Sequence, residues 1–165
     1  MIVDMLFAIV IHQNLSNYNM ELSNILSDMN YDFNTEQQIE LTEQEMNCLA
    51  LNIYHESRGE SITGQMAVAE VTLNRTQDER YPDDVCSVVW QENQFSWTSD
   101  NASDKPKDKK SWQRAQRIAR IISEKYNSSI NITNGAIMFH AVGSKPSWRK
   151  KFKRTIQIGD HVFYR

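Results

Sequence analysis

The sequence contains only two cysteines, Cys48 and Cys86. Two thiols are too few for the disulfide framework of a small secreted scaffold, and these two are not spaced as a metal-binding knuckle. A chain of 165 residues is long enough to bury one apolar core without such help. We therefore expect both thiols to be buried and free, and a single bridge between them is the alternative.

The sequence also lacks an apolar run of membrane-spanning length. The nearest approach to a secretion signal is MLFAIVI, residues 5–11, but Asp4 replaces the usual basic flank and no small-residue cleavage site follows. We expect a strand or helix fragment there, with an uncleaved export segment as the alternative.

Residues 12–41 are rich in Asn, Gln, Ser and acids. The expected division is therefore an appendage over 1–41 and one folded domain over 42–165.

Basic residues are scarce in the first part of the chain. Residues 1–104 hold 3 Lys or Arg against 18 Asp or Glu, whereas residues 105–154 hold 14 against 2. A basic surface of this kind suits a polyanion, such as nucleic acid or a bacterial wall that carries carboxylates and phosphates. A solvated face that balances the acidic part of the chain is the alternative.

The segment from Thr42 predicts a helix over residues 43–58. Thr42 and Glu45 match a capping box, in which the two side chains satisfy the first free amides of the helix. Gly59 is expected to close the helix as its C-cap. The buried stripe has the spacing i, i+3, i+4 and i+7 and consists of Met46, Leu49, Ala50 and Ile53.

The rest of the chain predicts a mainly helical α+β fold. Residues 64–75 are apolar on almost every side, apart from Glu70, and indicate a central helix. The sequence next predicts a turn at 81–82, a short helix over 83–91, an aromatic loop over 93–100 and a helix over 111–126. A strand over 135–141, a basic loop over 143–154 and two strands around the Gly159–Asp160 turn complete a small C-terminal antiparallel sheet.

Glu56 is the ionisable residue with the most informative position. It lies seven residues after Leu49 and three after Ile53, on the flank of the apolar stripe. A carboxyl group partly withdrawn from water has a raised pKa, so it can stay protonated near neutral pH and donate to a leaving oxygen. Cleavage of a glycosidic bond needs such a donor. The structural alternative is that Glu56 pairs with Arg58 or a distant arginine and fixes the helix end.

Four segments in the same order resemble the spore cortex-lytic, cell wall hydrolase family. IYHESRGESITGQMAVAEVTLNR, residues 53–75, is similar to its entry motif. YPDDVCSVVWQENQFSW (81–97), AIMFHAVGSKPSW (136–148) and IGDHVFYR (158–165) resemble three later motifs. Four collinear matches are far more specific than one short motif.

The resemblance implies a peptidoglycan lytic enzyme with a lysozyme-like or lytic-transglycosylase-like catalytic domain over 42–165. It also implies that Glu56 is the catalytic acid and base for the β-1,4 bond between N-acetylmuramic acid and N-acetylglucosamine. No second carboxylate is obviously paired with it, which suits transglycosylation, because the sugar's own 6-hydroxyl then replaces water. Glu60 and Glu70 are the rival second carboxylates, and each has a structural alternative: a turn cap or Arg58 pair for Glu60, helix packing for Glu70.

The candidate substrate-binding residues combine rings that can cover a pyranose with polar groups that can bond its hydroxyls. His140, His161 and Trp148 are included because they match positions of the family motifs. For each histidine, the alternative is a structural role in holding the sheet. Asn74 and Arg75 are expected to tie the second helix to neighbouring loops. The full set is Tyr54, Gln94, Phe95, Ser96, His140, Trp148 and His161.

Three alternatives remain beside the lytic transglycosylase. A zinc site built from His55, Glu56, His140 and His161 would favour an N-acetylmuramoyl-L-alanine amidase, but adjacent helical residues point about 100° apart. A simple muramidase and a non-catalytic wall- or nucleic-acid-binding module are the others. The favoured expectation is a monomer that acts on peptidoglycan with no cofactor, no metal and no nucleic acid, and that reaches the wall by secretion or as a phage endolysin released through a holin.

Overall fold

The computed structural model describes residues 20, 40–126 and 130–165. The chain divides into two units, Met1–Asn34 and Thr35–Arg165, and all the elements below belong to the second. The expected strand, helix or export segment over 5–11 lies outside the described residues, as does nearly all of the expected appendage over 1–41. The domain boundary at 41/42 therefore stays a prediction.

Four helices form the larger part of the described fold: α2 Glu43–Ser57, α3 Ile62–Thr76, α4 Val85–Trp90 and α5 Lys109–Lys125. Their starts follow side-chain capping chemistry. The Thr42–Glu45 capping box is confirmed, and the side chains of Ser61, Asp84 and Asp108 accept from the first turns of α3, α4 and α5. Gly59 does not close α2: the C-cap is Arg58 in a right-handed conformation, so no left-handed residue is needed there.

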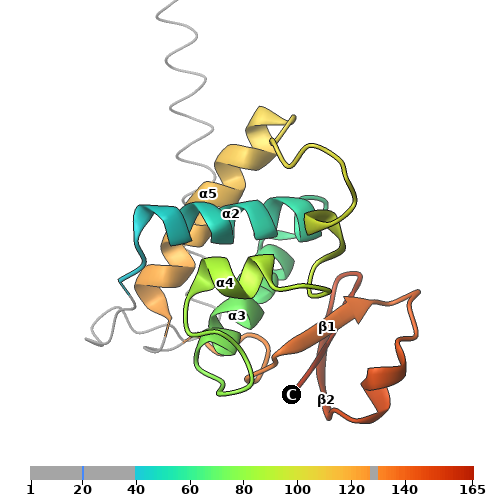
Figure 1. Cartoon of the computed structure of the whole chain (residues 1–165). Helices are drawn as coiled ribbons and strands as arrows, with labels where there is room; N and C mark the ends of the chain where they lie inside the picture. Colours follow the sequence, from blue (N-terminus) through green and yellow to red (C-terminus); the bar gives the residue numbers. More distant parts are fainter. Residues whose placement is uncertain (1–19, 21–39, 127–129) are drawn as a thin grey trace, which may run out of the picture. The chain divides into compact units, whose positions relative to one another are not determined.

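The central position predicted for residues 64–75 is confirmed. Helix α3 contacts α2, α4 and α5 as well as β1 and β2 (Figure 1), and most of its side chains are buried. A helix surrounded in this way has no wet face, which explains its apolar residues on nearly every side. Its last turn reaches the sheet, and the polar residues there become part of the site described below.

The sheet has three short antiparallel strands in the order β1-β3-β2: β1 Met138–Ala141, β2 Arg154–Ile158 and β3 His161–Tyr164. The predicted Gly159–Asp160 turn is confirmed, and Gly159 has φ +53°, which favours glycine. Strand β1 begins three residues later than expected, because the carbonyls of Ala136 and Ile137 accept from the side chains of Asn74 and Arg75.

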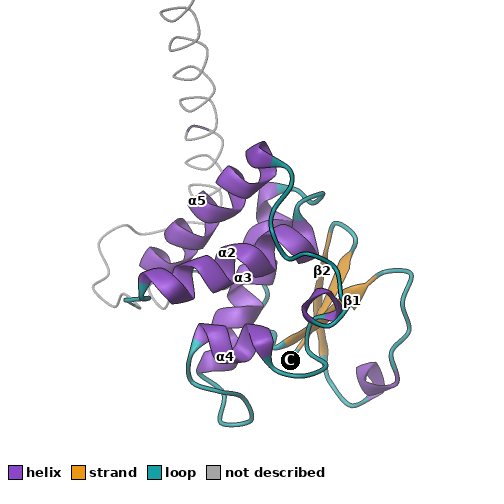
Figure 2. Ribbon diagram, turned by 45° about the horizontal axis from the view of Figure 1, so that its top comes forward, coloured by secondary structure: helices purple, strands orange, loops and turns teal. Residues whose placement is uncertain are grey.

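Two predicted loops contain short 3₁₀ turns, η1 Ser96–Thr98 and η2 Ser147–Lys150 (Figure 2).

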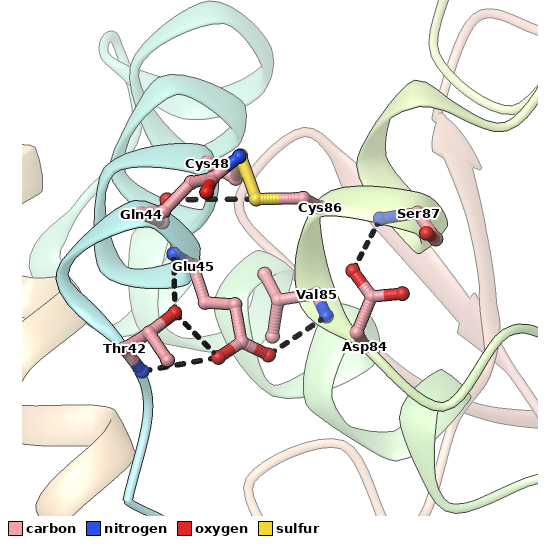
Figure 3. The surroundings of a disulfide bond; sticks show 8 residues. All are labelled: Thr42, Gln44, Glu45, Cys48, Asp84, Val85, Cys86 and Ser87. Carbon is pink, nitrogen blue, oxygen red and sulfur yellow. Dashed lines mark hydrogen bonds between the residues drawn. A yellow bond between two sulfur atoms is a disulfide. The ribbon is translucent and has the colours of Figure 1, made fainter.

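The expectation of two free thiols is wrong, because Cys48 and Cys86 form a disulfide (Figure 3). Their Cα atoms lie 5.3 Å apart although the residues are 38 apart in sequence. The bridge joins α2 to α4, and the Glu45 carboxylate joins the same two helices because it also accepts from the amide of Val85 at 3.4 Å. Only the packing of α4 on α2 brings the two cysteines together, so their spacing alone could not reveal the bridge.

Candidate active site

A cavity of about 530 Å³ lies where the end of α2, the end of α3, the η1 region and the sheet meet. Glu56 reaches it from the last turn of α2 and is half-buried. This is the position that the flank of an amphipathic helix predicts, because the stripe beside it is fixed in the core. The lining residues are Glu56, Arg75, Asn93, Gln94, Phe95, Ser96, Ser99, Phe139, His140, Ala141, Ser144 and His161.

The electrostatics of Glu56 suit proton donation. Burial raises the pKa of Glu56 to about 7, and the positive charge of Arg75 opposes that rise. A carboxyl group in this range is protonated in a large fraction of molecules near neutral pH and can also exist as the carboxylate. Glu56 can therefore both give and take back a proton.

Arg75, on the last turn of α3, is the main feature of the cavity that sequence reasoning missed. Its side chain is buried, and its Nε donates to the carbonyl of Ile137 at 2.7 Å. The guanidinium also lies 5.2 Å from the ring centres of Tyr81 and Phe95, which is within cation–π range. Its Nη1 is buried without a hydrogen-bond partner among the described residues. Arg75 thus ties α3 to the loop that leads into β1, in line with the expected tie to a neighbouring loop, and also places a cation beside Glu56.

The two cavity histidines differ in how their ring nitrogens are used. In His140, Nδ1 lies 2.8 Å from the carbonyl of Ala141 and Nε2 lies 2.9 Å from the hydroxyl of Tyr164. The carbonyl can only accept, so Nδ1 carries the proton and Nε2 accepts from the phenol when the ring is neutral. His161 makes no hydrogen bond to a described protein group, and its buried Nδ1 is 3.9 Å from Glu60 Oε1. His161 therefore places its buried Nδ1 near Glu60, while its ring lines the cavity.

The rival carboxylates do not line the cavity. Glu60 faces the β2–β3 turn instead of Arg58: its Oε2 accepts from the amide of Asp160 at 3.3 Å, and any side chain at Gly159 would collide with it. Glu70 lies in the core, where its Oε2 accepts from the amide of Thr133 at 2.9 Å. Both carboxylates therefore have structural roles, as the alternative interpretation expected. The partner of Glu60 is the amide of Asp160 and not Arg58, and the partner of Glu70 is the amide of Thr133.

The structure brings most of the predicted substrate-binding residues to this cavity. Gln94, Phe95, Ser96, His140 and His161 line it together with Glu56. Tyr54 and Trp148 do not. The Tyr54 hydroxyl instead accepts from the amides of residues 107 and 108 at 3.0 Å each, which fixes the start of α5. The Trp148 ring lies 5.7 Å from His140 and 5.5 Å from Tyr164, so it supports the wall from behind.

The residues of the proposed zinc site are not brought together. His55 lies outside the cavity lining: its Nε2 is 3.0 Å from the carbonyl of Asp104, and its ring stacks on Trp97 at 4.4 Å. Within residues 40–126 and 130–165, no three His, Cys, Asp or Glu side chains gather closely enough to hold a metal ion. The same part of the chain has no helix with both the length and the apolar character needed to cross a bilayer.

A family model described as Cell Wall Hydrolase matches residues 59–164. The spore cortex-lytic enzyme of Oceanobacillus iheyensis is 27% identical over 123 residues, 74% of this chain and 42% of that enzyme. The enzyme of the same name from Halalkalibacterium halodurans is 25% identical and matches over 74% of this chain and 35% of its own length. The chain thus spans less than half the length of either relative. The family match begins three residues after Glu56, so it does not test that carboxyl group.

The fold is similar to that of two solved domains. The catalytic domain of the germination-specific lytic transglycosylase SleB from Bacillus anthracis superposes with a TM-score of 0.62 at 23% identity and covers 76% of this chain and 97% of that domain. The catalytic domain of the Bacillus cereus SleB protein gives 0.60 at 22% identity and covers 76% and 93%. At these identities the likeness shows a shared fold.

Proposed function

This chain belongs to the cell wall hydrolase family, and on that premise we propose that it degrades peptidoglycan by cutting the β-1,4 bond between N-acetylmuramic acid and N-acetylglucosamine. It does so as a lytic transglycosylase with Glu56 as the single general acid and base. The site of action is the bacterial cell wall, reached by secretion or by release of a phage endolysin. The partner is the glycan strand, and the enzyme works as a monomer without a cofactor.

One observation carries the proposal: Glu56 is the only acidic side chain among the described residues that line the cavity. Burial raises its pKa to about 7. Hydrolysis of a glycosidic bond normally uses two carboxyl groups that flank it, roughly 5 to 10 Å apart. A cavity with a single acid favours a reaction in which the substrate supplies its own nucleophile.

The reaction then needs one proton donor that becomes a base. Protonated Glu56 donates to the glycosidic oxygen as the bond from C1 of the muramoyl sugar to that oxygen breaks, and the departing sugar leaves with a hydroxyl group. The 6-hydroxyl of the muramoyl sugar bonds to C1, and its proton passes to the Glu56 carboxylate. The product is a 1,6-anhydro ring, and Glu56 regains its starting state.

Arg75 acts on the charge that forms on Glu56. After donation the carboxylate is negative in a partly buried site, where an isolated charge is unfavourable. Arg75 already lowers the pKa of this group, so it stabilises the carboxylate that must wait for the second proton. It thereby keeps the pKa of Glu56 within the range where donation and acceptance are both possible.

The cavity walls supply groups suited to a sugar. Phe95 offers an aromatic ring to a pyranose face, while Gln94 and Ser96 can bond hydroxyl or acetamido groups. The His161 ring lines the cavity and its Nδ1 lies 3.9 Å from Glu60 Oε1, whereas both ring nitrogens of His140 are committed to Ala141 and Tyr164. We therefore expect the His161 ring to contact substrate and His140 to hold the sheet edge in place. Tyr54 and Trp148 support the two sides of the site from outside the cavity.

The names of the relatives agree with this chemistry. The matched enzymes are called spore cortex-lytic, and one solved domain is called a lytic transglycosylase. Because the relatives are much longer than the matched region, their whole-protein substrates do not transfer by similarity alone. The bond that is cut and the mechanism must therefore be established from the reaction products and from variants of Glu56.

Mass spectrometry of the products tests the proposal. Purified peptidoglycan treated with the wild-type protein should release fragments with 1,6-anhydromuramoyl ends, and Glu56→Gln should release none while retaining its fold by circular dichroism. Fragments with reducing ends would identify a muramidase that activates water. Unaltered release by Glu56→Gln, or fragments cut between muramic acid and alanine, would contradict the proposal.

A further inference from the structure

The connection between β1 and β2 is the most strongly basic surface segment of the described chain. Residues 142–154, here called the basic connection, contain six Lys or Arg and no Asp or Glu. All six are exposed except Arg149, which is half-buried. No ion pair joins any of them to an acidic side chain within residues 40–126 and 130–165. The six are Lys145, Arg149, Lys150, Lys151, Lys153 and Arg154.

This charge does not reflect a basic protein as a whole. The formal net charge of the chain is -3, so the six cations stand out against an acidic remainder. Six like charges in so short a segment repel one another, and no acidic side chain of the described residues forms an ion pair with them. Such an arrangement favours an anionic partner whose charges are spaced along a chain.

The basic connection is held next to the cavity. It follows directly after Ala141, and Ser144 within it lines the cavity wall. The ring of Trp148, on η2, contacts His140 and Tyr164 at 5.7 Å and 5.5 Å between centres. At its far end Lys153 exchanges two backbone hydrogen bonds with Arg165, at 2.9 Å and 2.8 Å. Figure 2 shows the connection extending away from the helices with its short helical turn, and the connection begins at the cavity wall, where Ser144 lies.

The substrate of the proposed reaction places anions beside this cavity. Each muramoyl sugar of peptidoglycan carries a short peptide through its lactyl ether, and that peptide has free carboxylates. When the bond on that sugar lies at Glu56, the peptide must leave the cavity on one side. A basic segment that begins at the cavity wall would attract its carboxylates, whereas an acidic segment there would repel them.

We propose, resting on the function proposed above, that the basic connection binds the carboxylates of the peptide attached to the muramoyl sugar. The protein thereby selects glycan strands that still carry their peptides over strands from which the peptides have been removed. The contact acts on substrate binding and not on the chemical step, because none of the six cations lies in the cavity lining.

The test compares three proteins on two substrates. K145Q/K150Q/K151Q removes three exposed charges from the basic connection. K105Q/K109Q/K110Q removes three exposed charges from the segment that leads into α5 and is the matched control. The substrates are purified glycan strands with their peptides and the same strands after digestion by an N-acetylmuramoyl-L-alanine amidase, with wall phosphopolymers removed from both.

The wild-type protein and the control variant should prefer peptide-bearing strands in kcat/KM. K145Q/K150Q/K151Q should lose about tenfold on those strands, mainly through KM, which is the effect of three exposed ion pairs acting together. On peptide-free strands, which keep only the lactyl carboxylate that the amidase frees, the three proteins should differ by much less than tenfold. Raising the salt concentration should reduce the wild-type preference, because exposed charges are screened.

Two results would overturn the inference. One is an unchanged preference for peptide-bearing strands in K145Q/K150Q/K151Q. The other is a loss that appears only when phosphopolymers are left on the wall, which would assign the basic connection to phosphate. Failure of the proposed function looks different, since no fragments with 1,6-anhydromuramoyl ends would then be released from either substrate by any of the three proteins.

Discussion

Glu56 and Glu70 lie on neighbouring helices and have the same raised pKa, about 7, for the same main reason, which is burial. Their surroundings differ. Glu70 is 1% exposed and accepts from the Thr133 amide, so its carboxyl group is used inside the fold. Glu56 lines an open cavity beside Arg75, and no hydrogen bond to its carboxyl group occurs within the described residues.

The comparison teaches that a shifted pKa is not sufficient to identify a catalytic acid. Burial raises the pKa of any carboxyl group, whether it serves stability or chemistry. Two features distinguish Glu56 from Glu70. Glu56 lines a cavity, and the nearby charge of Arg75 can stabilise its ionised form. Each prediction below changes one member of this pair or its surroundings.

The largest expected effect separates the two carboxyl groups by activity. Glu56→Gln should lower kcat/KM on peptidoglycan by about a thousandfold or more, because an amide cannot donate and then accept the proton. Glu70→Gln should remain within about threefold of wild type after correction for the folded fraction, since its amide oxygen can still accept from Thr133. Rates of fragment release, measured beside circular dichroism spectra, check both. Equal losses at equal folded fractions would remove the distinction.

The next effect concerns stability and pH. Folding raises the pKa of Glu70 from about 4.5 to about 7, so between these values the folded protein binds more protons than the unfolded chain. Stability is therefore full below about pH 4.5 and falls as pH rises to about 7, by on the order of 3 kcal/mol for this group. Urea unfolding of wild type and Glu70→Gln at pH 4.5 and pH 8 measures it.

The difference between the two proteins isolates Glu70, because every other titrating group is common to both. Glu70→Gln should show the smaller decrease in unfolding free energy between the two pH values. Parallel curves for the two proteins would mean that the Glu70 carboxyl group titrates alike in the folded and unfolded states.

The smallest effect tests the cation beside Glu56. Arg75 lowers the pKa of Glu56, so Arg75→Gln should move the alkaline limb of the kcat/KM profile to higher pH, where wild type loses the protonated acid. Arg75→Lys keeps the charge and should restore most of the wild-type position. The limb should not move in Glu70→Gln. An unshifted limb in Arg75→Gln would show that the two charges do not interact.

Several features of the fold could be predicted because they follow from neighbouring residues. The capping box at Thr42, the all-round apolar character of 64–75 and the Gly159–Asp160 turn each depend on local spacing. The mainly helical fold with its small antiparallel sheet is confirmed, and the two solved domains share that fold. The position of Glu56 on the flank of a buried stripe belongs with these local features.

Features that depend on distant segments could not be read from spacing. The Cys48–Cys86 bridge needs α4 to pack on α2, and the contact of Arg75 with the sheet joins residues 62 positions apart. Tyr54 illustrates the same limit: it lies two residues before Glu56, but its hydroxyl accepts from the backbone just before α5 instead of lining the cavity. Buried polar partners of this kind are set by tertiary packing, which no single helix encodes.

The most direct test of the central claim is a carbon NMR titration of the carboxyl groups in Glu70→Gln, where Glu56 is, among the described residues, the remaining glutamate with a strongly raised pKa. The account predicts one carboxyl resonance with a midpoint near pH 7, which disappears in Glu56→Gln/Glu70→Gln. A protein whose glutamates all titrate near pH 4.5, the ordinary value, would contradict it, because Glu56 would then be an ionised surface group with no proton to give at neutral pH.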